Sequence, residues 1–211
     1  MKILVLGASQ GTGALCVQQA LAHGHDVSAF ARSPQKLTLE HPKLTRVTGD
    51  FHDRASVEKA VPGHDAVIIT ASATQLSAFK ERPDYFSRGT GYAIEAMKAH
   101  GVKRLVLLSA LGTAESRPLL NVVVRALMVD WMLKEAFLDH AVQEQLAKAT
   151  ELEWVIARPG RLTNGPAKGA FVKTPKLEKV PSAISRADVA AFLVEACTST
   201  SFVRQAVQLG G

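Results

Sequence analysis

A glycine-rich segment near the start of the chain carries the clearest chemical signal in the sequence. It comprises residues 7–13 (GASQGTG), between a short apolar run at 2–6 and a helical pattern at 13–23. Glycines in such a loop allow a tight turn and let a pyrophosphate approach the backbone, and the N-terminus of the following helix offers free N–H donors. The segment therefore predicts a dinucleotide-binding loop. The alternative is a glycine-rich turn that binds nothing.

The residues after a second predicted strand, 26–31, indicate which dinucleotide would bind. In an NAD-binding fingerprint an acidic residue lies about 20 residues beyond the loop and binds the ribose 2′-hydroxyl. This chain has Arg32 and Ser33 at that place, with Lys36 nearby. A guanidinium pairs well with a phosphate, so the sequence favours NADP over NAD. The competing interpretation is that Arg32 is a solvated loop charge.

Two other predicted strand ends point to the same crevice. Asp50 follows a strand at 44–48, where its carboxylate could accept a hydrogen bond from an adenine amino group or simply cap a turn. Residues 71–73 (ASA) follow a strand at 66–70. Side chains this small would let a dinucleotide lie close to the backbone, although they could equally form a plain turn.

These residues need a scaffold in which short apolar strands alternate with helices. The sequence predicts such strands at 2–6, 26–31, 44–48, 66–70, 104–108, 154–157 and 207–209. It predicts helices at 13–23, 56–61, 85–99 and 185–197, an N-cap at Asp53, and two helical pieces between 113 and 150. Buried strands that alternate with helices are typical of a parallel sheet covered on both faces. We therefore predict an α/β fold with a doubly wound, Rossmann-type sheet in a single domain, 1–211, and a substrate region at about 110–185.

The composition excludes several other classes of protein. Hydrophobic residues make up 47% of the 211 residues, which is enough for a sizeable core. The net charge of +6 fits nucleic acid or an anionic small ligand, and the chain has no basic run interleaved with aromatic residues, so we expect no nucleic-acid binding. The two cysteines, Cys16 and Cys197, match no zinc pattern and are expected to lie buried in a reducing cytoplasm, and no metal site is expected. The apolar stretch at 119–133 is shorter than the roughly 20 residues of a membrane span, so no membrane insertion is expected.

Motifs spread over nearly the whole chain resemble the atypical short-chain dehydrogenases/reductases. The closest resemblance is to the group that contains flavin reductase/biliverdin-IX-beta reductase and the NmrA-like NAD(P)H-binding proteins. The matching stretches include KILVLGASQGTG, VTGDFHD, AIEAMKAHGVKRLVLLSA and WVIARPGRLTNGPAKGAF. The resemblance implies a Rossmann-type fold with NADP lying across the strand ends.

The same resemblance implies a role for each matching position. The pyrophosphate would lie against Gly7, Ser9, Gln10, Gly11, Thr12 and Gly13. Arg32 and Ser33 would bind the 2′-phosphate, and Asp50 and Phe51 the adenine. The path of the ribose would follow Ala71, Ser72 and Ala73, and the nicotinamide would lie near Ser109, Pro159 and Gly160.

The chain departs from the ordinary short-chain dehydrogenases in its catalytic residues. The Tyr-x-x-x-Lys pair is absent, because Gly89 and Ala96 stand four residues after the only tyrosines, Tyr85 and Tyr92. That pair is what proton donation to a ketone, or proton removal from an alcohol, would require. Chemistry that needs less help from the protein is therefore favoured.

Ser109 and His140 remain as candidates for a direct role in catalysis. The hydroxyl of Ser109 could orient the nicotinamide amide or the acceptor. His140 could titrate near neutral pH and pair with Glu144 one helical turn away, or the pair could merely anchor its helix. The apolar segment 118–138 fits either a lid over an apolar ring or a helix packed on the sheet or on a second subunit.

The leading hypothesis is an NADPH-dependent reductase of a flavin, quinone or similar conjugated acceptor, in the form of a cytoplasmic monomer or homodimer. Such a ring delocalises the charge that arrives with the hydride, and water can supply the proton. The alternative is a non-catalytic NADP(H)-sensing regulatory protein of the NmrA-like type. A sugar-nucleotide epimerase or dehydratase fits less well, because it needs the Tyr-Lys pair and a larger substrate domain.

Overall fold

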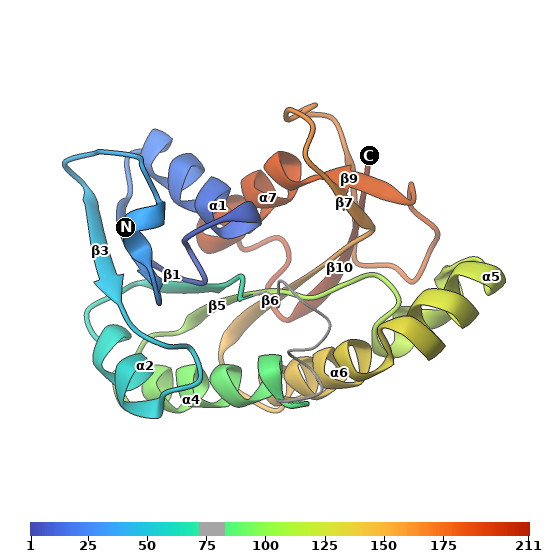
Figure 1. Ribbon diagram of the computed structural model, residues 1–211, viewed down its shortest axis with the longest axis horizontal. Coiled ribbons are helices and arrows are strands. Elements are labelled where there is room, and N and C mark those ends of the chain that lie inside the picture. Colours follow the sequence, from blue (N-terminus) through green and yellow to red (C-terminus); the bar gives the residue numbers. More distant parts are fainter. Residues whose placement is uncertain (72–82) are drawn as a thin grey trace.

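The protein is built around a β-sheet whose strands are nearly all parallel (Figure 1). The computed structural model describes residues 1–71 and 83–211. The parallel strands are β1 (Lys2–Leu6), β2 (Asp26–Ala31), β3 (Leu44–Thr48), β4 (Ala66–Ile69), β5 (Arg104–Leu108), β6 (Glu153–Pro159) and β10 (Gln205–Gly210). β8 (Val172–Thr174) pairs antiparallel with β10. The order across the sheet is β3-β2-β1-β4-β5-β6-β10-β8.

Helices cover both faces of this sheet. α1 (Gly11–Ala22) and α7 (Arg186–Thr198) lie together on one face. α2 (Arg54–Ala60), α4 (Tyr85–Ala99) and α6 (Lys134–Lys148) lie side by side on the other face (Figure 1). The arrangement is a doubly wound, Rossmann-like single domain, which confirms the predicted fold class.

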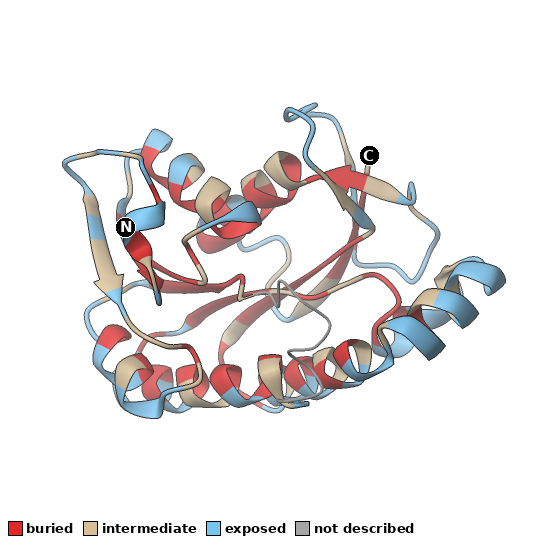
Figure 2. Cartoon of the chain, viewed as in Figure 1, coloured by how far each residue is buried: buried red, intermediate tan, exposed pale blue. Residues whose placement is uncertain are grey.

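Each face of the sheet has its own hydrophobic core. Along β1, Ile3 and Val5 point into the core beneath α1 and α7, whereas Leu4 and Leu6 point into the core beneath α2 and α4. Figure 2 shows the buried residues following the sheet and the inner sides of the helices. Strands covered on both faces need apolar side chains at successive positions, which explains the continuous apolar run of β1.

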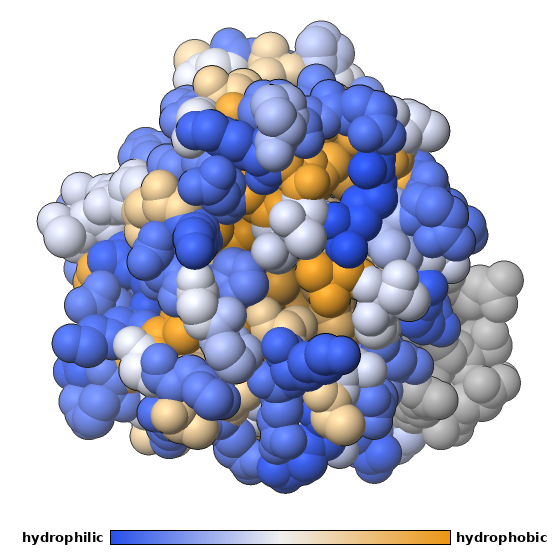
Figure 3. Space-filling model, turned by 90° about the vertical axis from the view of Figure 1, so that its left-hand side faces the viewer, coloured by the Kyte–Doolittle hydropathy of each residue, from blue (hydrophilic) through white to orange (hydrophobic). Residues whose placement is uncertain are grey.

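The strand order reverses beside β1. The chain runs outward from β1 through β2 to β3, then returns to β4 on the other side of β1. At such a switch point the loops after the two central strands diverge and leave a crevice at the carboxyl ends of the strands. Figure 3 views the molecule from its β3 side, where apolar side chains show between a rim of hydrophilic ones.

Most elements lie where the sequence predicts them. Four strands and the helix at 85–99 have the predicted bounds, and α1 begins two residues before the predicted position. The carboxylate of Asp53 accepts a hydrogen bond from the Ser56 N–H (2.9 Å) and caps α2 as expected. Three short strands were not predicted: β7 (Arg161–Thr163), β8 and β9 (Ala183–Ser185). Each has only three residues, too few for an alternating pattern to be recognised.

The segment between residues 113 and 150 is helical in more pieces than the two predicted. A 3₁₀ turn at 114–119 is followed by α5 (Val122–Val124), a π-helical stretch at 125–132 and then α6. Val122, Val123 and Trp131 are 65%, 71% and 73% exposed. The part at 122–132 therefore does not pack on the sheet, which leaves a lid or a contact with a second subunit as interpretations of this apolar segment.

Ser185 caps α7 from a buried position, so its removal should cost stability. Its Oγ accepts a hydrogen bond from the Asp188 N–H (3.0 Å) and donates one to the Asp188 carboxylate (2.7 Å). Replacing an N-cap serine by alanine typically costs about 1 kcal/mol and at most about 2 kcal/mol. We expect Ser185→Ala to lower the free energy of unfolding in urea by about that amount. Ser201→Ala, at an exposed position, serves as the control. Equal free energies of unfolding for the two variants would contradict a stabilising role of Ser185 as the N-cap of α7.

Candidate functional site

A cavity of about 550 Å³ opens at the carboxyl ends of β1 to β4. Its wall brings together these predicted cofactor residues: Gly7, Ser9, Gln10, Arg32, Ser33, Asp50, Phe51 and Ala71. Lys36 also lines it, as do His52 and Tyr85, which the sequence did not single out. Residues from four separate strand ends thus meet around one space of the size that a ligand requires.

The other predicted site residues in the described part of the chain are not part of the wall of this cavity. Gly11, Thr12 and Gly13 form the first turn of α1. Ser109 follows β5, and Pro159 and Gly160 are the last residue of β6 and the one after it. His140 lies on α6. Ser72 and Ala73 fall outside the described residues.

The glycines of the loop are required by close backbone contacts. Gly7 has φ +94°, and a Cβ there would lie 2.7 Å from the Ala71 backbone nitrogen. A Cβ on Gly13 would lie 2.2 Å from the Gly7 carbonyl oxygen. No side chain fits at either position, so the loop lies against the end of β4 and leaves the crevice open above it.

The N-terminus of α1 is available to an anion. Its N-cap residue, Gln10, makes no side-chain cap hydrogen bond, and the first turn contains no acidic residue. The first N–H groups of a helix lack partners within the helix and carry the positive end of its dipole. This end of the cavity therefore suits a phosphate or pyrophosphate.

The β2 end of the cavity presents cations. Arg32 and Lys36 are exposed, and neither forms an ion pair with any described residue. Asp50 has one carboxylate oxygen engaged, because Oδ1 accepts a hydrogen bond from the His52 N–H (3.0 Å). Oδ1 therefore caps the turn at 50–52, which is one of the two roles expected for Asp50. The arrangement favours a second anionic group near Arg32, separate from the one at the helix N-terminus.

A row of aromatic rings leads from the cavity to α6. The ring centroids of His52 and Tyr85 are 4.4 Å apart, and those of Tyr85 and Phe86 are 5.4 Å apart. Phe86 stacks on His140 at 3.9 Å with an interplanar angle of 13°. Sequence reasoning missed this row because its members come from a loop and two helices that are distant along the chain.

His140 does not pair with Glu144, although the two residues lie one helical turn apart as expected. Its Nδ1 lies 2.9 Å from Gln143 Oε1, and Glu144 faces other partners. Burial lowers the pKa of His140 below its ordinary value of 6.5, and the hydrogen bond to Gln143 and the nearby acidic groups only partly oppose this shift. His140 is therefore neutral at pH 7 and anchors α6 against α4.

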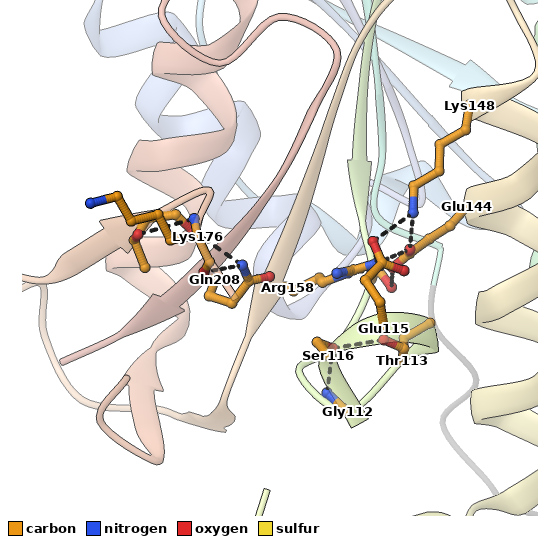
Figure 4. Close-up of polar contacts among 11 residues, drawn as sticks. Gly112, Thr113, Glu115, Ser116, Glu144, Lys148, Arg158, Lys176 and Gln208 are labelled. Carbon is orange, nitrogen blue, oxygen red and sulfur yellow. Dashed lines mark hydrogen bonds and ion pairs between the residues drawn. The ribbon is translucent and has the colours of Figure 1, made fainter. Parts of the chain in front are cut away.

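Ser109 belongs to a buried polar network that includes Glu144 and Arg158. Figure 4 shows Glu144, Arg158 and two further charged members of this network, Glu115 and Lys148. The Oγ of Ser109 donates to Glu144 Oε1 at 2.7 Å, and Arg158 Nε donates to the same oxygen at 2.9 Å. A second bond joins Arg158 Nη2 to the other oxygen of Glu144. Arg158 and Glu144 are both fully buried. A bidentate ion pair thus joins β6 to α6, and the Ser109 hydrogen bond joins the residue after β5 to the same carboxylate.

Two more charged side chains complete the network at its exposed side. Glu115 lies 3.0 Å from Arg158 Nη2 and 3.0 Å from Lys148 Nζ, and Lys148 also reaches Glu144 at 3.3 Å. Burial raises the pKa of Glu115, but hydrogen bonds and the two cations outweigh that effect and lower its pKa to about 2. The two carboxylates balance the two cations.

Within residues 1–71 and 83–211, no cluster of His, Cys, Asp or Glu is arranged to hold a metal ion. None of the helices in the same ranges has both the length and the apolar character that a membrane span requires.

The chain belongs to the NAD(P)H-binding family, whose model matches residues 7–200. This match spans the glycine loop, the cavity and the buried network. The family and the fold confirm the resemblance to the atypical short-chain dehydrogenases/reductases.

Relatives of known sequence or structure resemble the chain over most of its length. It is 28% identical over 193 residues to YhfK of Bacillus subtilis, described as an uncharacterized sugar epimerase, across 90% of this chain and 85% of YhfK. ChuY of Escherichia coli O157:H7, an anaerobilin reductase, has a TM-score of 0.81 and 25% identity and covers 100% of this chain and 97% of its own. A short-chain dehydrogenase/reductase from Veillonella parvula in complex with NADP has a TM-score of 0.83 at 16% identity, across 100% and 94% of the two chains, and so shows the fold alone.

Removing one partner of the buried ion pair should lower the free energy of unfolding more than removing both partners. Arg158→Met leaves Glu144 as a buried carboxylate that has lost its bidentate partner, and such a loss typically costs about 3–5 kcal/mol. In the double variant Glu144→Met with Arg158→Met, apolar packing replaces both charges, and the cost should be smaller. Urea unfolding of the three proteins measures both differences. A double variant less stable than Arg158→Met would contradict this account.

His140 should make the stability of the protein depend on pH. Its pKa in the folded state lies below the 6.5 of an exposed histidine, so the unfolded chain binds the proton first as the pH falls. The free energy of unfolding should therefore decrease as the pH drops below about 6.5. We expect His140→Phe, which keeps a ring against Phe86, to reduce this decrease. If urea unfolding of the variant showed the same pH dependence as the wild type, His140 would not be the group responsible for the loss of stability.

Proposed function

We propose that the protein is an NADPH-dependent reductase that transfers a hydride to a flavin, quinone or similar conjugated acceptor. The observation that carries the cofactor proposal is the pair of uncommitted cations, Arg32 and Lys36, on the wall of the cavity next to the glycine loop. The structural similarity to the reductase ChuY and to the Veillonella protein that binds NADP supports the same conclusion.

The cofactor would lie across the switch point of the sheet. Its adenine half would occupy the cavity over β2 and β3, with the pyrophosphate at the N-terminus of α1 and the 2′-phosphate beside Arg32. Its nicotinamide half would extend toward β5 and β6, where Ser109, Pro159 and Gly160 follow the strands. Ala71 would border the ribose between the two halves.

The missing tyrosine–lysine pair points to acceptors that need no strong acid from the protein. Bound NADPH supplies a hydride, and a conjugated ring takes up its two electrons by delocalisation. A proton from water completes the reduction. The protein then contributes mainly by holding two flat rings face to face and by excluding side reactions.

A non-catalytic NADP(H) sensor is the second candidate, and one observation favours it. The segment 122–132 carries exposed apolar side chains, among them Trp131 at 73% exposure. Such a surface suits contact with a partner protein. The same surface could instead belong to a substrate lid or to the interface of a homodimer.

Both cysteines are buried and free, which suits the reducing conditions of a cytoplasm. Burial raises the pKa of Cys197 to about 12, so this thiol stays protonated and unreactive. These features support our proposal that the reaction takes place in the cytoplasm.

The reductase proposal is tested by NADPH oxidation with FMN and a series of quinones. We expect turnover above the buffer rate with at least one acceptor, measured by the loss of absorbance of NADPH. Binding affinities for NADP⁺ and NADPH are measured in parallel. NADPH binding without turnover over the whole series would contradict the reductase, and unequal affinities in that case would favour the sensor.

Arg32→Ala should lower kcat/KM for NADPH much more than kcat/KM for NADH. A charge-assisted hydrogen bond contributes about 1.5–3 kcal/mol, which corresponds to a loss of about 10- to 150-fold in kcat/KM for NADPH. The value for NADH should remain nearly unchanged, since NADH has no 2′-phosphate. Lys98→Ala, at the far end of α4, is the control for a lost surface charge. An equal loss with both cofactors would show that Arg32 does not bind the 2′-phosphate.

A further inference from the structure

A second cavity, of about 420 Å³, lies beside α6 on the face of the sheet that α6 covers. Its inner wall is formed by β6 and the start of β10, and its rim by Lys148 at the end of α6 and by the turn at 175–177 after β8. It shares no lining residue with the cavity at the carboxyl ends of β1 to β4. The dinucleotide proposed for the first cavity therefore does not account for the second.

The wall of this second cavity is positively charged. Only one carboxylate among the described residues, Glu115, lines it, whereas the lining cations are Lys148, Arg158, Lys176 and Arg204. Glu144 and Glu151, which lie outside the wall, balance part of this charge. The ammonium of Lys176 forms no ion pair with any described residue. The cavity therefore attracts an anion.

The guanidinium of Arg158 adds an unused donor group to this wall. Its Nε and Nη2 donate to Glu144, whereas its Nη1 is buried and has no hydrogen-bond partner among the described residues. A guanidinium is always charged in a protein, and a buried N–H group without an acceptor is costly. Because Arg158 lines the cavity, an acceptor for Nη1 can come from a molecule that binds there.

Two glutamine side chains next to Arg158 also have unused polar atoms. Gln208 is the partner of Arg158 in the register of β10 and β6, and Gln205 lines the cavity. The Oε1 atoms of both glutamines are buried and have no hydrogen-bond partner in the described part of the chain. The Nε2 of Gln208 donates to the Lys176 carbonyl oxygen at 2.8 Å and so ties the turn at 175–177 to β10 (Figure 4). Three unpartnered polar atoms thus lie on neighbouring strands at one place.

The remaining wall of the cavity is apolar. The indole of Trp154 is largely buried, and Leu177 at the rim is 54% exposed. An inorganic anion would leave these side chains uncovered. An organic anion would bury them as well as meeting the cations, which makes it the better match for this wall.

We propose that this cavity is a second ligand site, which binds a small organic carboxylate with an apolar body. The carboxylate accepts hydrogen bonds from Arg158 Nη1 and from the Lys176 ammonium, and the apolar body lies against Trp154 and Leu177. The ligand reaches Nη1 by displacing the exposed side chains of Lys176 and Leu177 at the rim. The site is independent of the proposed reductase activity.

The test uses phenylacetate as the probe and phenylacetamide as its neutral counterpart of nearly the same shape. In the full-length variant Trp131→Phe, Trp154 is the only tryptophan, so its fluorescence reports on the wall of the cavity. Phenylacetate should change this fluorescence saturably, with a dissociation constant of about 1 mM or lower, which about ten non-hydrogen atoms allow. Isothermal titration calorimetry of the wild type should give the same constant. Phenylacetamide should bind at least about 10-fold more weakly, because it lacks the charge.

Lys176→Ala and Lys179→Ala form a matched pair of variants. Both lysines are exposed in the segment between β8 and β9, but only Lys176 lines the cavity. Lys176→Ala should weaken the binding of phenylacetate about 2- to 5-fold, as the loss of an exposed ion pair predicts. Lys179→Ala should leave the dissociation constant unchanged. An equal effect of the two substitutions would contradict a contact with Lys176.

Substitutions at Leu177 and Arg158 test the charge of the site directly. Leu177→Glu places a carboxylate at the rim and should weaken phenylacetate far more than phenylacetamide, whereas the neutral Leu177→Gln should affect the two probes alike. The double variant Glu144→Met with Arg158→Met removes the buried guanidinium and should reduce the preference for phenylacetate. If the double variant does not fold, the variants of Lys176 and Leu177 still decide the question.

Failure of phenylacetate to bind, or equal affinities for phenylacetate and its amide, would overturn the proposal and leave water as the occupant of the cavity. The dissociation constant should be the same with and without saturating NADP⁺. Competition between the two would also overturn the proposal, since it would place the probe in the cavity at the carboxyl ends of β1 to β4. None of these measurements uses turnover, so a failure of the reductase proposal would not change their outcome.

Discussion

The contact between the glycine loop and the end of β4 is the constraint on which the site depends. At Gly7 and Gly13 the backbones approach so closely that no Cβ can be accommodated. The loop therefore lies against the end of β4, the neighbour of β1 in the sheet, and α1 starts at the edge where these strands end. A side chain at either glycine would push the loop away, tilt the helix and separate the anion-binding N–H groups from the strand ends that carry Arg32 and Ala71.

The buried pair of Glu144 and Arg158 is a second constraint, and stability alone does not account for it. Well-packed apolar side chains usually serve a core as well as a buried ion pair does, and often better. The pair instead fixes geometry. Leu108 and Ala157 are partners in the register of β5 and β6, so the residues that follow them, Ser109 and Arg158, lie side by side. Glu144 from α6 joins both and so orients the Ser109 hydroxyl.

The fold, and the meeting of several predicted residues on the wall of one cavity, could be predicted from the sequence because their causes are local. A strand buried on both faces is a continuous apolar run, and the parallel topology then places the residues after each run at one edge. This reasoning located Arg32, Asp50 and the glycine loop. It failed for the predicted pairing of His140 with Glu144, because the spacing on a helix shows which residues are close but not which partner each of them binds. Glu144 lies within reach of His140, yet it binds Arg158, which arrives from a strand 14 residues further along.

The distribution of charge also bears on the choice between a reductase and a sensor. A sensor needs different affinities for the two redox states, since a ligand shifts an equilibrium only by its differential affinity. Oxidation places a positive charge on the nicotinamide ring. The network around Ser109 contains two carboxylates and two cations, so its formal charges cancel. Arg32 and Lys36, which form no ion pair with a described residue, lie on the wall of the cavity, where the proposed cofactor would carry the same charge before and after the reaction. This distribution of charge offers no preference for one redox state and therefore supports the proposed reductase rather than the sensor.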